Sequence, residues 1–407
     1  MIAFTVWQVL GQWWVGLVAF GVALVATPVA RYIAYRTRIV DRPDDLLKPH
    51  GRPIAYMGGL AMCAGLLVGL GAYLAKMPGL RQNWDRLVEC ASAMRILELA
   101  ENPIWSMTSI AIACLMVTIM GLLDDIRSLK PRQKIYWQVA SALVLVAGGV
   151  GNKMAMLILG QIAPEAYWPV WVVLPVSSLM CIVLVIATCN STNLLDGLDG
   201  LCGGVTEIIA LGFLALAVLL ACYGDAPRQG DPQLTQEYDA LRVTLCLAMA
   251  GAILGFLPYN VPPASIFMGD AGSMLLGLFV ATMMAMFCRE MTARWLLAAI
   301  MVYSLPIADT GLAVVRRFIA GKSIFAGDRS HLYDQLVDRG MTVKKVVVLF
   351  YLLAALAAFL GVFLTTVLRG REALVIYAAL AAIVWIIFWR TGMIKPPPHD
   401  AGRKIHE

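Results

Sequence analysis

Apolar residues occur along the whole chain in runs of about 20, separated by short polar segments. Runs of this length are long enough to cross a hydrocarbon core about 30 Å thick as α-helices. Taking each run as one helix predicts about eleven helices, centred near residues 22, 66, 113, 144, 179, 212, 250, 279, 305, 355 and 381. The pattern therefore predicts an all-α, polytopic membrane protein, with one transmembrane domain over residues 1–390 and a disordered cytoplasmic tail over residues 391–407.

The composition agrees with a membrane protein. Of the 407 residues, 60% are hydrophobic and only 14% are charged, whereas roughly 25% of a soluble domain is charged. The first apolar run, from about Trp13 to Ala30, has no Lys or Arg before it and no cleavage signature after it, so we expect a retained helix rather than a removable signal peptide. The nine cysteines include no CxxC pair and are expected to be free thiols.

The basic residues lie in the short segments between the predicted helices. Assigning these segments alternately to two sides places 21 Lys and Arg on one side and 11 on the other. The richer side is then cytoplasmic, with the N-terminus outside and the C-terminus inside. Membrane orientation explains the net charge of +6 better than nucleic-acid binding does. The polar motifs described next all fall on the cytoplasmic side, which predicts one shared active centre.

Five aspartates stand at or near predicted helix ends on that side: Asp124, Asp125, Asp196, Asp199 and Asp270. A carboxylate at membrane depth costs roughly 2.5 to 3.5 kcal/mol on insertion scales, so this cluster indicates a cation or a polar cavity. Mg²⁺ is the natural candidate, because it prefers oxygen ligands and joins one or two carboxylates to substrate phosphates. Helix capping is the alternative for Asp270 and for the adjacent pair, of which only one member is expected to be a direct ligand or base.

The segment NSTNLLDGLDGL, residues 190–201, is the most informative stretch. Asn190, Asn193, Asp196 and Asp199 recur at every third position, which places oxygen atoms on neighbouring positions of one helical face. Capping of a turn needs fewer such side chains. In the later GDAGS segment, the start of a helix with Ser273 and free amides is a second way to hold phosphate.

Two basic segments complete the set of candidates. One contains Lys48 and His50, and the other runs from Arg316 to Arg329 and His331. Both could neutralise a diphosphate, although topology is an equally good reason for the Lys and Arg residues.

Taken together, these motifs resemble the polyprenyl-phosphate N-acetylhexosamine 1-phosphate transferase family (glycosyltransferase family 4). The family includes the phospho-N-acetylmuramoyl-pentapeptide transferase and the undecaprenyl-phosphate N-acetylglucosamine 1-phosphate transferases. The resemblance extends in collinear order from about Lys48 to Gln335, and includes the Pro53–Gly59 segment, the aspartate pair, the NxxNxxDGLDGL and GDxGS stretches, and PIAD at 306–309 with Arg316–Arg317. It implies ten or eleven spans around a cytoplasmic cleft for Mg²⁺, a nucleotide sugar and a lipid phosphate.

The resemblance also implies roles for individual residues. Asn193 and Asp270 would lie at the metal, which is Mg²⁺ with Mn²⁺ as an alternative. The catalytic candidates are Asp124, Asp125, Asp196 and Asp199, and the substrate-binding candidates are Lys48, His50, Asn190, Arg316, Arg329 and His331. The HxHH-like cluster of the family is reduced here to His331, with Tyr333 and Asp334 in the later places. The segment GKSIFAGDRSHLYDQL resembles the N-acetylglucosamine branch more closely.

We therefore expect transfer of N-acetylglucosamine 1-phosphate from UDP-N-acetylglucosamine to undecaprenyl phosphate, or another polyprenyl phosphate, at the cytoplasmic face of the inner (plasma) membrane. The products would be UMP and the first lipid-linked sugar of a cell-envelope polysaccharide. The expected partners are the UDP-sugar, the polyprenyl phosphate and the membrane, without nucleic acid, and a homodimer is left open. One alternative is a phospho-N-acetylmuramoyl-pentapeptide transferase. The other is an ion-coupled transporter, which predicts charges on both sides of the bilayer and an inverted repeat that we do not find.

Overall fold

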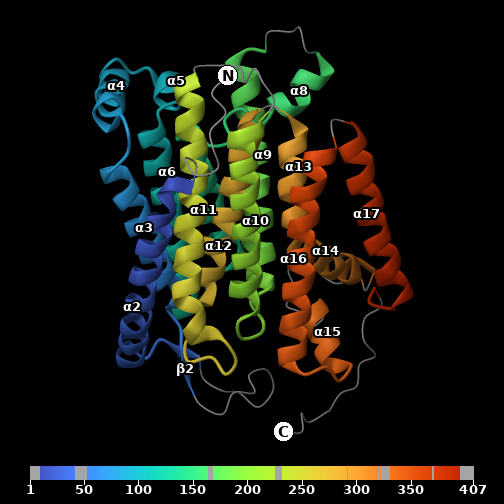
Figure 1. Cartoon of the computed structure of the whole chain (residues 1–407). Coiled ribbons are helices and arrows are strands. Elements are labelled where there is room, and N and C mark those ends of the chain that lie inside the picture. Colours follow the sequence, from blue (N-terminus) through green and yellow to red (C-terminus); the bar gives the residue numbers. More distant parts are fainter. Residues whose placement is uncertain are drawn as a thin grey trace.

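The computed structural model of the chain describes residues 10–41, 53–163, 168–224, 232–290, 292–319, 321, 331–368 and 371–394 (Figure 1). The long helices are α2 (Trp13–Thr37), α3 (Gly58–Ala75), α6 (Pro103–Arg127), α7 (Pro131–Ala147), α9 (Val170–Leu194), α10 (Leu201–Tyr223), α11 (Pro232–Asn260), α12 (Gly269–Phe287), α13 (Ala293–Val302), α14 (Ser304–Ile319), α16 (Val343–Val367) and α17 (Arg371–Arg390). The shorter elements are η1 (Leu10–Gln12), α4 (Leu80–Ser92), α5 (Ile96–Leu99), α8 (Met156–Ile162), η2 (Cys288–Glu290) and α15 (Leu332–Asp338). The all-helical prediction is thus confirmed for the described residues, apart from one very small sheet.

The number of candidate membrane spans is smaller than expected. Nine helices in the described ranges are long and apolar enough to cross a membrane, and the pair α13–α14 adds a tenth if it counts as one span. All eleven predicted centres fall within helices. However, α7 has only 17 residues, a rise of about 26 Å, and the run near residue 305 is broken by a bend of 72°. The described residues therefore contain nine or ten candidate spans, compared with the eleven expected.

Helix α12 lies at the centre of the bundle. In its apolar window 94% of the residues are buried, against 17% for α9 and 11% for α17. α12 packs against α3, α6, α9 and α13. Close packing against α6 requires a glycine, because a Cβ on Gly121 would lie 2.4 Å from the backbone nitrogen of Ala271. The exposed apolar faces of α9 and α17 are those expected of helices that border lipid.

Several helix ends meet at one end of the bundle, which we call the site end. The small sheet lies there and pairs β1 (Val40–Asp41) with β2 (Ile54–Ala55) in antiparallel register. Backbone hydrogen bonds from Gly58 and Gly59 to Phe267 and Met268 then tie the start of α3 to the segment that precedes α12. Helices α4, α5 and α8 lie at the opposite end (Figure 1).

The first and last described residues lie at opposite ends of the bundle. Helix α2 begins far from the site end, and α17 ends at it, where the carbonyl of Met393 accepts a hydrogen bond from Arg316 of α14 (Figure 1). The predicted tail, apart from residues 391–394, lies outside the described residues. None of the nine cysteines, all within the described ranges, forms a disulfide.

Candidate active site

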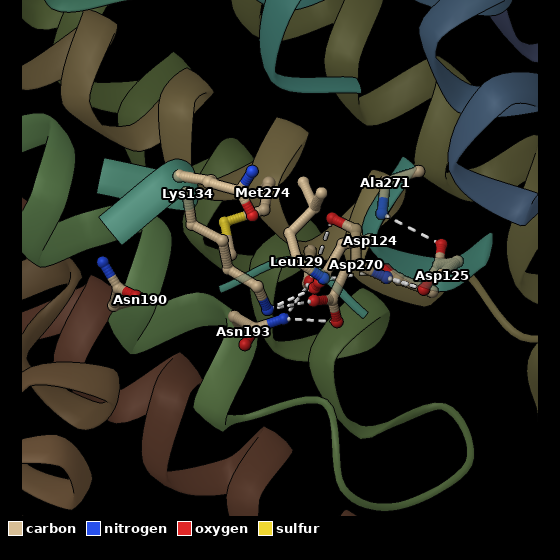
Figure 2. Close-up of polar contacts among 12 residues, drawn as sticks. Asp124, Asp125, Leu129, Lys134, Asn190, Asn193, Asp270, Ala271 and Met274 are labelled. Carbon is tan, nitrogen blue, oxygen red and sulfur yellow. Dashed lines mark hydrogen bonds and ion pairs between the residues drawn. The ribbon is translucent and has the colours of Figure 1, made fainter. Parts of the chain in front are cut away.

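The two adjacent aspartates at the end of α6 face different neighbours (Figure 2). Asp124 is buried, accepts a hydrogen bond of 2.6 Å from the amide of Leu129 and forms an ion pair with Lys134 of α7. The carboxylate of Asp125 instead accepts hydrogen bonds from the amides of Asp270, at 2.9 Å, and Ala271, at 3.4 Å. Asp125 therefore caps the start of α12. Asp124 instead belongs to a group of contacting side chains that we call the charged cluster: Asp124, Lys134, Asn193 and Asp270.

This capping answers one of the alternatives raised by the sequence. The amides at the start of α12 were expected to be free for a phosphate, but Asp125 binds those of Asp270 and Ala271, the second and third residues of the helix. The glycine before them makes this possible: Gly269 adopts a φ of 68°, and a Cβ there would lie 2.4 Å from the Asp125 carboxylate. The idea that these amides hold phosphate is therefore not supported.

Asp270 is the centre of the charged cluster. One of its oxygens lies 2.9 Å from the ammonium nitrogen of Lys134, and the other accepts a hydrogen bond of 2.9 Å from the side-chain amide of Asn193. The same Asn193 nitrogen lies 2.9 Å from the hydroxyl of Ser273. Side chains from α6, α7, α9 and α12 thus converge on one point (Figure 2). The expected metal residues, Asn193 and Asp270, are in direct contact.

Lys134 is the functional residue that the sequence did not single out, because it was counted only among the basic residues that set topology. It bridges two carboxylates that come from different helices, Asp124 and Asp270. The side chain is 24% exposed, so it is only partly buried. The available signal was its place in the polar first turn of α7, soon after the aspartate pair.

The loop of residues 195–200, between α9 and α10, carries the other two aspartates. Asp199 accepts a hydrogen bond of 2.8 Å from the amide of Ala264, so it ties the loop to a neighbouring turn. The side chain of Asp196 makes no hydrogen bond to any residue that the structure describes. Loss of solvent, followed by the negative charges of Asp270 and Asp125, raises the pKa of Asp196 to about 8. Asp196 is the loop carboxylate that remains available to a ligand.

Asn190 lies apart from the charged cluster (Figure 2). Its side-chain nitrogen donates to the carbonyl of Ile186, at 2.7 Å, and to Gln138 of α7, at 3.2 Å. The expected row of four polar side chains is therefore not one continuous surface, because the chain leaves α9 after Leu194. In this arrangement Asn190 contacts α7 rather than the aspartates.

The remaining substrate-binding candidates divide into three groups. His331 is buried at the start of α15, where its Nδ1 lies 2.8 Å from Asp309 of α14. Arg316 is also buried, at 1% exposed, and it donates a hydrogen bond to the carbonyl of Met393. Lys48, His50 and Arg329 lie outside the described residues. Asp309 belongs to the PIAD motif, but no role was predicted for it.

The cluster suits a divalent cation that is shared with a substrate. In the described part of the chain, no group of three or more His, Cys, Asp or Glu side chains could hold a metal alone. Mg²⁺ commonly uses one or two protein carboxylates together with substrate phosphates. Asp124, Asp270 and the amide of Asn193 fit this mode, and Lys134 already supplies one positive charge to the two carboxylates.

Comparisons with known proteins give the family and the relatives of the chain. The family model described as glycosyl transferase family 4 matches residues 107–288, which include all five aspartates and Lys134. The chain is 31% identical over 362 residues to a decaprenyl-phosphate N-acetylglucosaminephosphotransferase of Mycobacterium leprae (strain TN), covering 85% of this chain and 81% of that protein. It is 26% identical to a probable undecaprenyl-phosphate N-acetylglucosaminyl 1-phosphate transferase of Bacillus subtilis (strain 168), covering 93% and 92%.

A third relative comes from a different group. The chain is 34% identical over 263 residues to a phospho-N-acetylmuramoyl-pentapeptide-transferase of Moorella thermoacetica (strain ATCC 39073 / JCM 9320), covering 61% of this chain and 73% of that protein. The resemblance inferred from the motifs is thereby confirmed.

Proposed function

Because this chain belongs to glycosyl transferase family 4 as a polyprenyl-phosphate N-acetylhexosamine 1-phosphate transferase, we propose that its donor is UDP-N-acetylglucosamine. The acceptor would be undecaprenyl phosphate or another polyprenyl phosphate, and the second product UMP. The observation that carries this proposal is the convergence of Asp124, Lys134, Asn193 and Asp270 at one end of a membrane bundle. Membership of a transferase family sets the transporter alternative aside.

The choice of N-acetylglucosamine is supported by the extent of the similarity. The two relatives named for this sugar cover 85% and 93% of the chain. The relative named for the muramoyl-pentapeptide covers 61%, although it is 34% identical where it matches. The pentapeptide donor therefore remains the second candidate.

The central difficulty of the reaction is that two anions must meet. Two unit charges 4 Å apart repel by roughly 4 kcal/mol at an effective dielectric constant of 20. Asp270, Asp124 and Asn193 would hold Mg²⁺, which when bound supplies positive charge against the phosphates. Lys134 would add a second positive charge directly beside it, because its ammonium already lies 2.9 Å from Asp270.

The remaining residues position the reactants. Asp125 fixes the start of α12, and with it the direction of Asp270. Asp196 faces the same space from the 195–200 loop. A lipid phosphate has a second pKa of about 6, so it is largely ionised near pH 7 and its oxygen can attack the donor without a strong base. In-line placement then contributes most of the remaining acceleration.

We also propose that the site end faces the cytoplasm of a plasma membrane. When the segments between the predicted helices are assigned alternately to the two sides of the membrane, the side with the polar motifs carries 21 of the 32 Lys and Arg residues. Segments rich in Lys and Arg stay on the cytoplasmic side. A green fluorescent protein fused after the C-terminus should fluoresce in intact cells. A dark fusion of normal abundance would place the site end on the other side.

A donor screen with the purified enzyme tests the proposal. The enzyme should release UMP from UDP-N-acetylglucosamine only when polyprenyl phosphate and a divalent cation are both present. UDP-N-acetylmuramoyl-pentapeptide serves as the competing donor, and turnover with that donor alone would contradict the choice of sugar. Omission of the lipid controls for simple hydrolysis of the donor.

A further inference from the structure

Two tyrosines hold the 195–200 loop, one at each end. The hydroxyl of Tyr333, in α15, donates a hydrogen bond of 3.0 Å to the carbonyl of Leu194, the last residue of α9. The hydroxyl of Tyr351, in α16, donates a hydrogen bond of 2.6 Å to the carbonyl of Gly200, just before α10. Both bonds connect parts of the chain that are far apart, at separations of 139 and 151 residues.

Both phenols also lie directly against backbone. A Cβ on Gly197 would be 2.1 Å from the Tyr333 hydroxyl oxygen, and a Cβ on Gly204 would be 2.1 Å from that of Tyr351. Real Cβ contacts essentially never fall below 3.0 Å, so only glycine allows either tyrosine to reach its carbonyl. Gly197 therefore makes room for the phenol of Tyr333, and Gly204 makes room for the phenol of Tyr351.

The ring of Tyr333 is itself held on two sides. It is 5% exposed, stacks on His331 with centroids 5.5 Å apart and planes at 9°, and meets the edge of Phe350 at 6.4 Å. His331 in turn contacts Asp309, which also accepts a hydrogen bond of 2.6 Å from the amide of Leu332. A phenol held in this way has little freedom to turn toward a substrate.

The loop needs such support for two physical reasons. The carbonyl groups at the end of a helix lack partners within the helix, and Leu194 is the last residue of α9. The loop also carries Asp196, which lies near Asp125 and Asp270, so movement of the loop would change the distance of this carboxyl group from the cluster.

We propose that Tyr333 and Tyr351 are positioning residues that clamp the two ends of the 195–200 loop, so that Asp196 stays directed toward the reacting phosphates. This inference rests on the proposed function. It assigns Tyr333 a role in backbone support, in a place where the resemblance led us to expect a histidine. An imidazole is shorter than a phenol and would not reach the carbonyl of Leu194.

The first test is kinetic. Tyr333→Phe and Tyr351→Phe each remove one hydroxyl and keep the ring. Each should lower kcat about tenfold, equivalent to about 1.4 kcal/mol, with the KM for the UDP-sugar within about twofold and an unchanged pH profile. Tyr259→Phe is the matched control, because its hydroxyl bonds the carbonyl of Leu24 in α2, away from the loop. It should keep activity within about twofold.

An altered pH profile in Tyr333→Phe would overturn the inference, because it would show that the phenol takes part in proton transfer. Activity within twofold of wild type in both loop variants would also overturn it.

The second test does not depend on activity. Hydrogen–deuterium exchange of the intact protein, followed by mass spectrometry, should show about fivefold to tenfold faster exchange for peptides covering residues 195–200 in both loop variants, and no change in Tyr259→Phe. Equal exchange in all three variants overturns the inference. If the wild-type protein releases no UMP while exchange still increases in the loop variants, the proposed function fails and the clamp stands.

Discussion

Lys134→Met removes the one described cation that bridges two carboxylates of the charged cluster. The methionine side chain has similar length and keeps the apolar part of the lysine. Asp124 and Asp270 are then left facing each other without the ammonium that separates them. We expect the variant to be less stable without metal and to bind Mg²⁺ more tightly.

The expected magnitude follows from the geometry. At the 2.9 Å between the Lys134 nitrogen and the Asp270 oxygen, attraction is about 6 kcal/mol at an effective dielectric constant of 20. Much of this is offset by desolvation, and breaking a buried pair costs about 3 to 5 kcal/mol. The side chains of Lys134 and Asp270 are 24% and 27% exposed, so we expect a net loss of about 2 kcal/mol after solvent screening.

Thermal unfolding of the purified protein, with a chelator and across a Mg²⁺ titration, measures both effects. In the presence of the chelator, the variant should unfold about 4 °C below wild type. The Mg²⁺ concentration for half of the maximal stabilisation should fall about tenfold, or about 1.4 kcal/mol, because a repelling charge has been removed. Lys130→Met is the matched control, since Lys130 is exposed and lies just before the same helix.

Two results would refute this reasoning. The first is that Lys134→Met and Lys130→Met unfold at the same temperature in the presence of the chelator. The second is a Mg²⁺ titration that matches wild type, which would mean that the metal binds away from Asp124 and Asp270.

Three further predictions concern the same region. Asp270→Asn or Asn193→Ala should abolish Mg²⁺-dependent UMP release while membrane insertion persists, and wild-type-like activity would remove that residue from the metal site. Because the pKa of Asp196 is raised to about 8, this acid is mostly protonated at pH 7 and becomes negative as the pH rises. The half-saturating Mg²⁺ concentration should therefore fall up to about pH 8 and then level off, and Asp196→Asn should flatten this dependence. Gly121→Ala places a Cβ 2.4 Å from the backbone nitrogen of Ala271. Such overpacking destabilises by about 1 to 3 kcal/mol or more, so the yield of folded protein should fall. Gly71→Ala is the control and should keep the yield, because a Cβ there has nothing within 4 Å.

The sequence predicted the helices well, because long apolar runs have few alternatives in a membrane. It also predicted that the aspartates share one end of the bundle. It gave more spans than the nine or ten candidates of the described residues, because α7 has only 17 residues and because the run near residue 305 is two helices with a break at Tyr303. Pro306, three residues later, was the available signal.

The directions of the side chains were not predictable in the same way. Spacing indicated that Asp124 and Asp125 diverge, but not that Asp125 would bind the amides of α12. The pairings of Lys134 with Asp270 and of Tyr333 with Leu194 connect residues 136 and 139 positions apart. Such partners depend on how helices pack, and a single sequence carries no periodic signal for them.

The origin of the charged cluster in four separate helices has a consequence for biosynthesis. The ribosome delivers Asp124 and Lys134 close together in the chain, whereas Asp270 emerges 136 residues after Lys134. During synthesis Lys134 is therefore available to Asp124 long before Asp270 is. A nascent chain that stops before α12 holds this pair without the residue that completes the site, so competence for the donor arises only once the later half of the chain has been inserted.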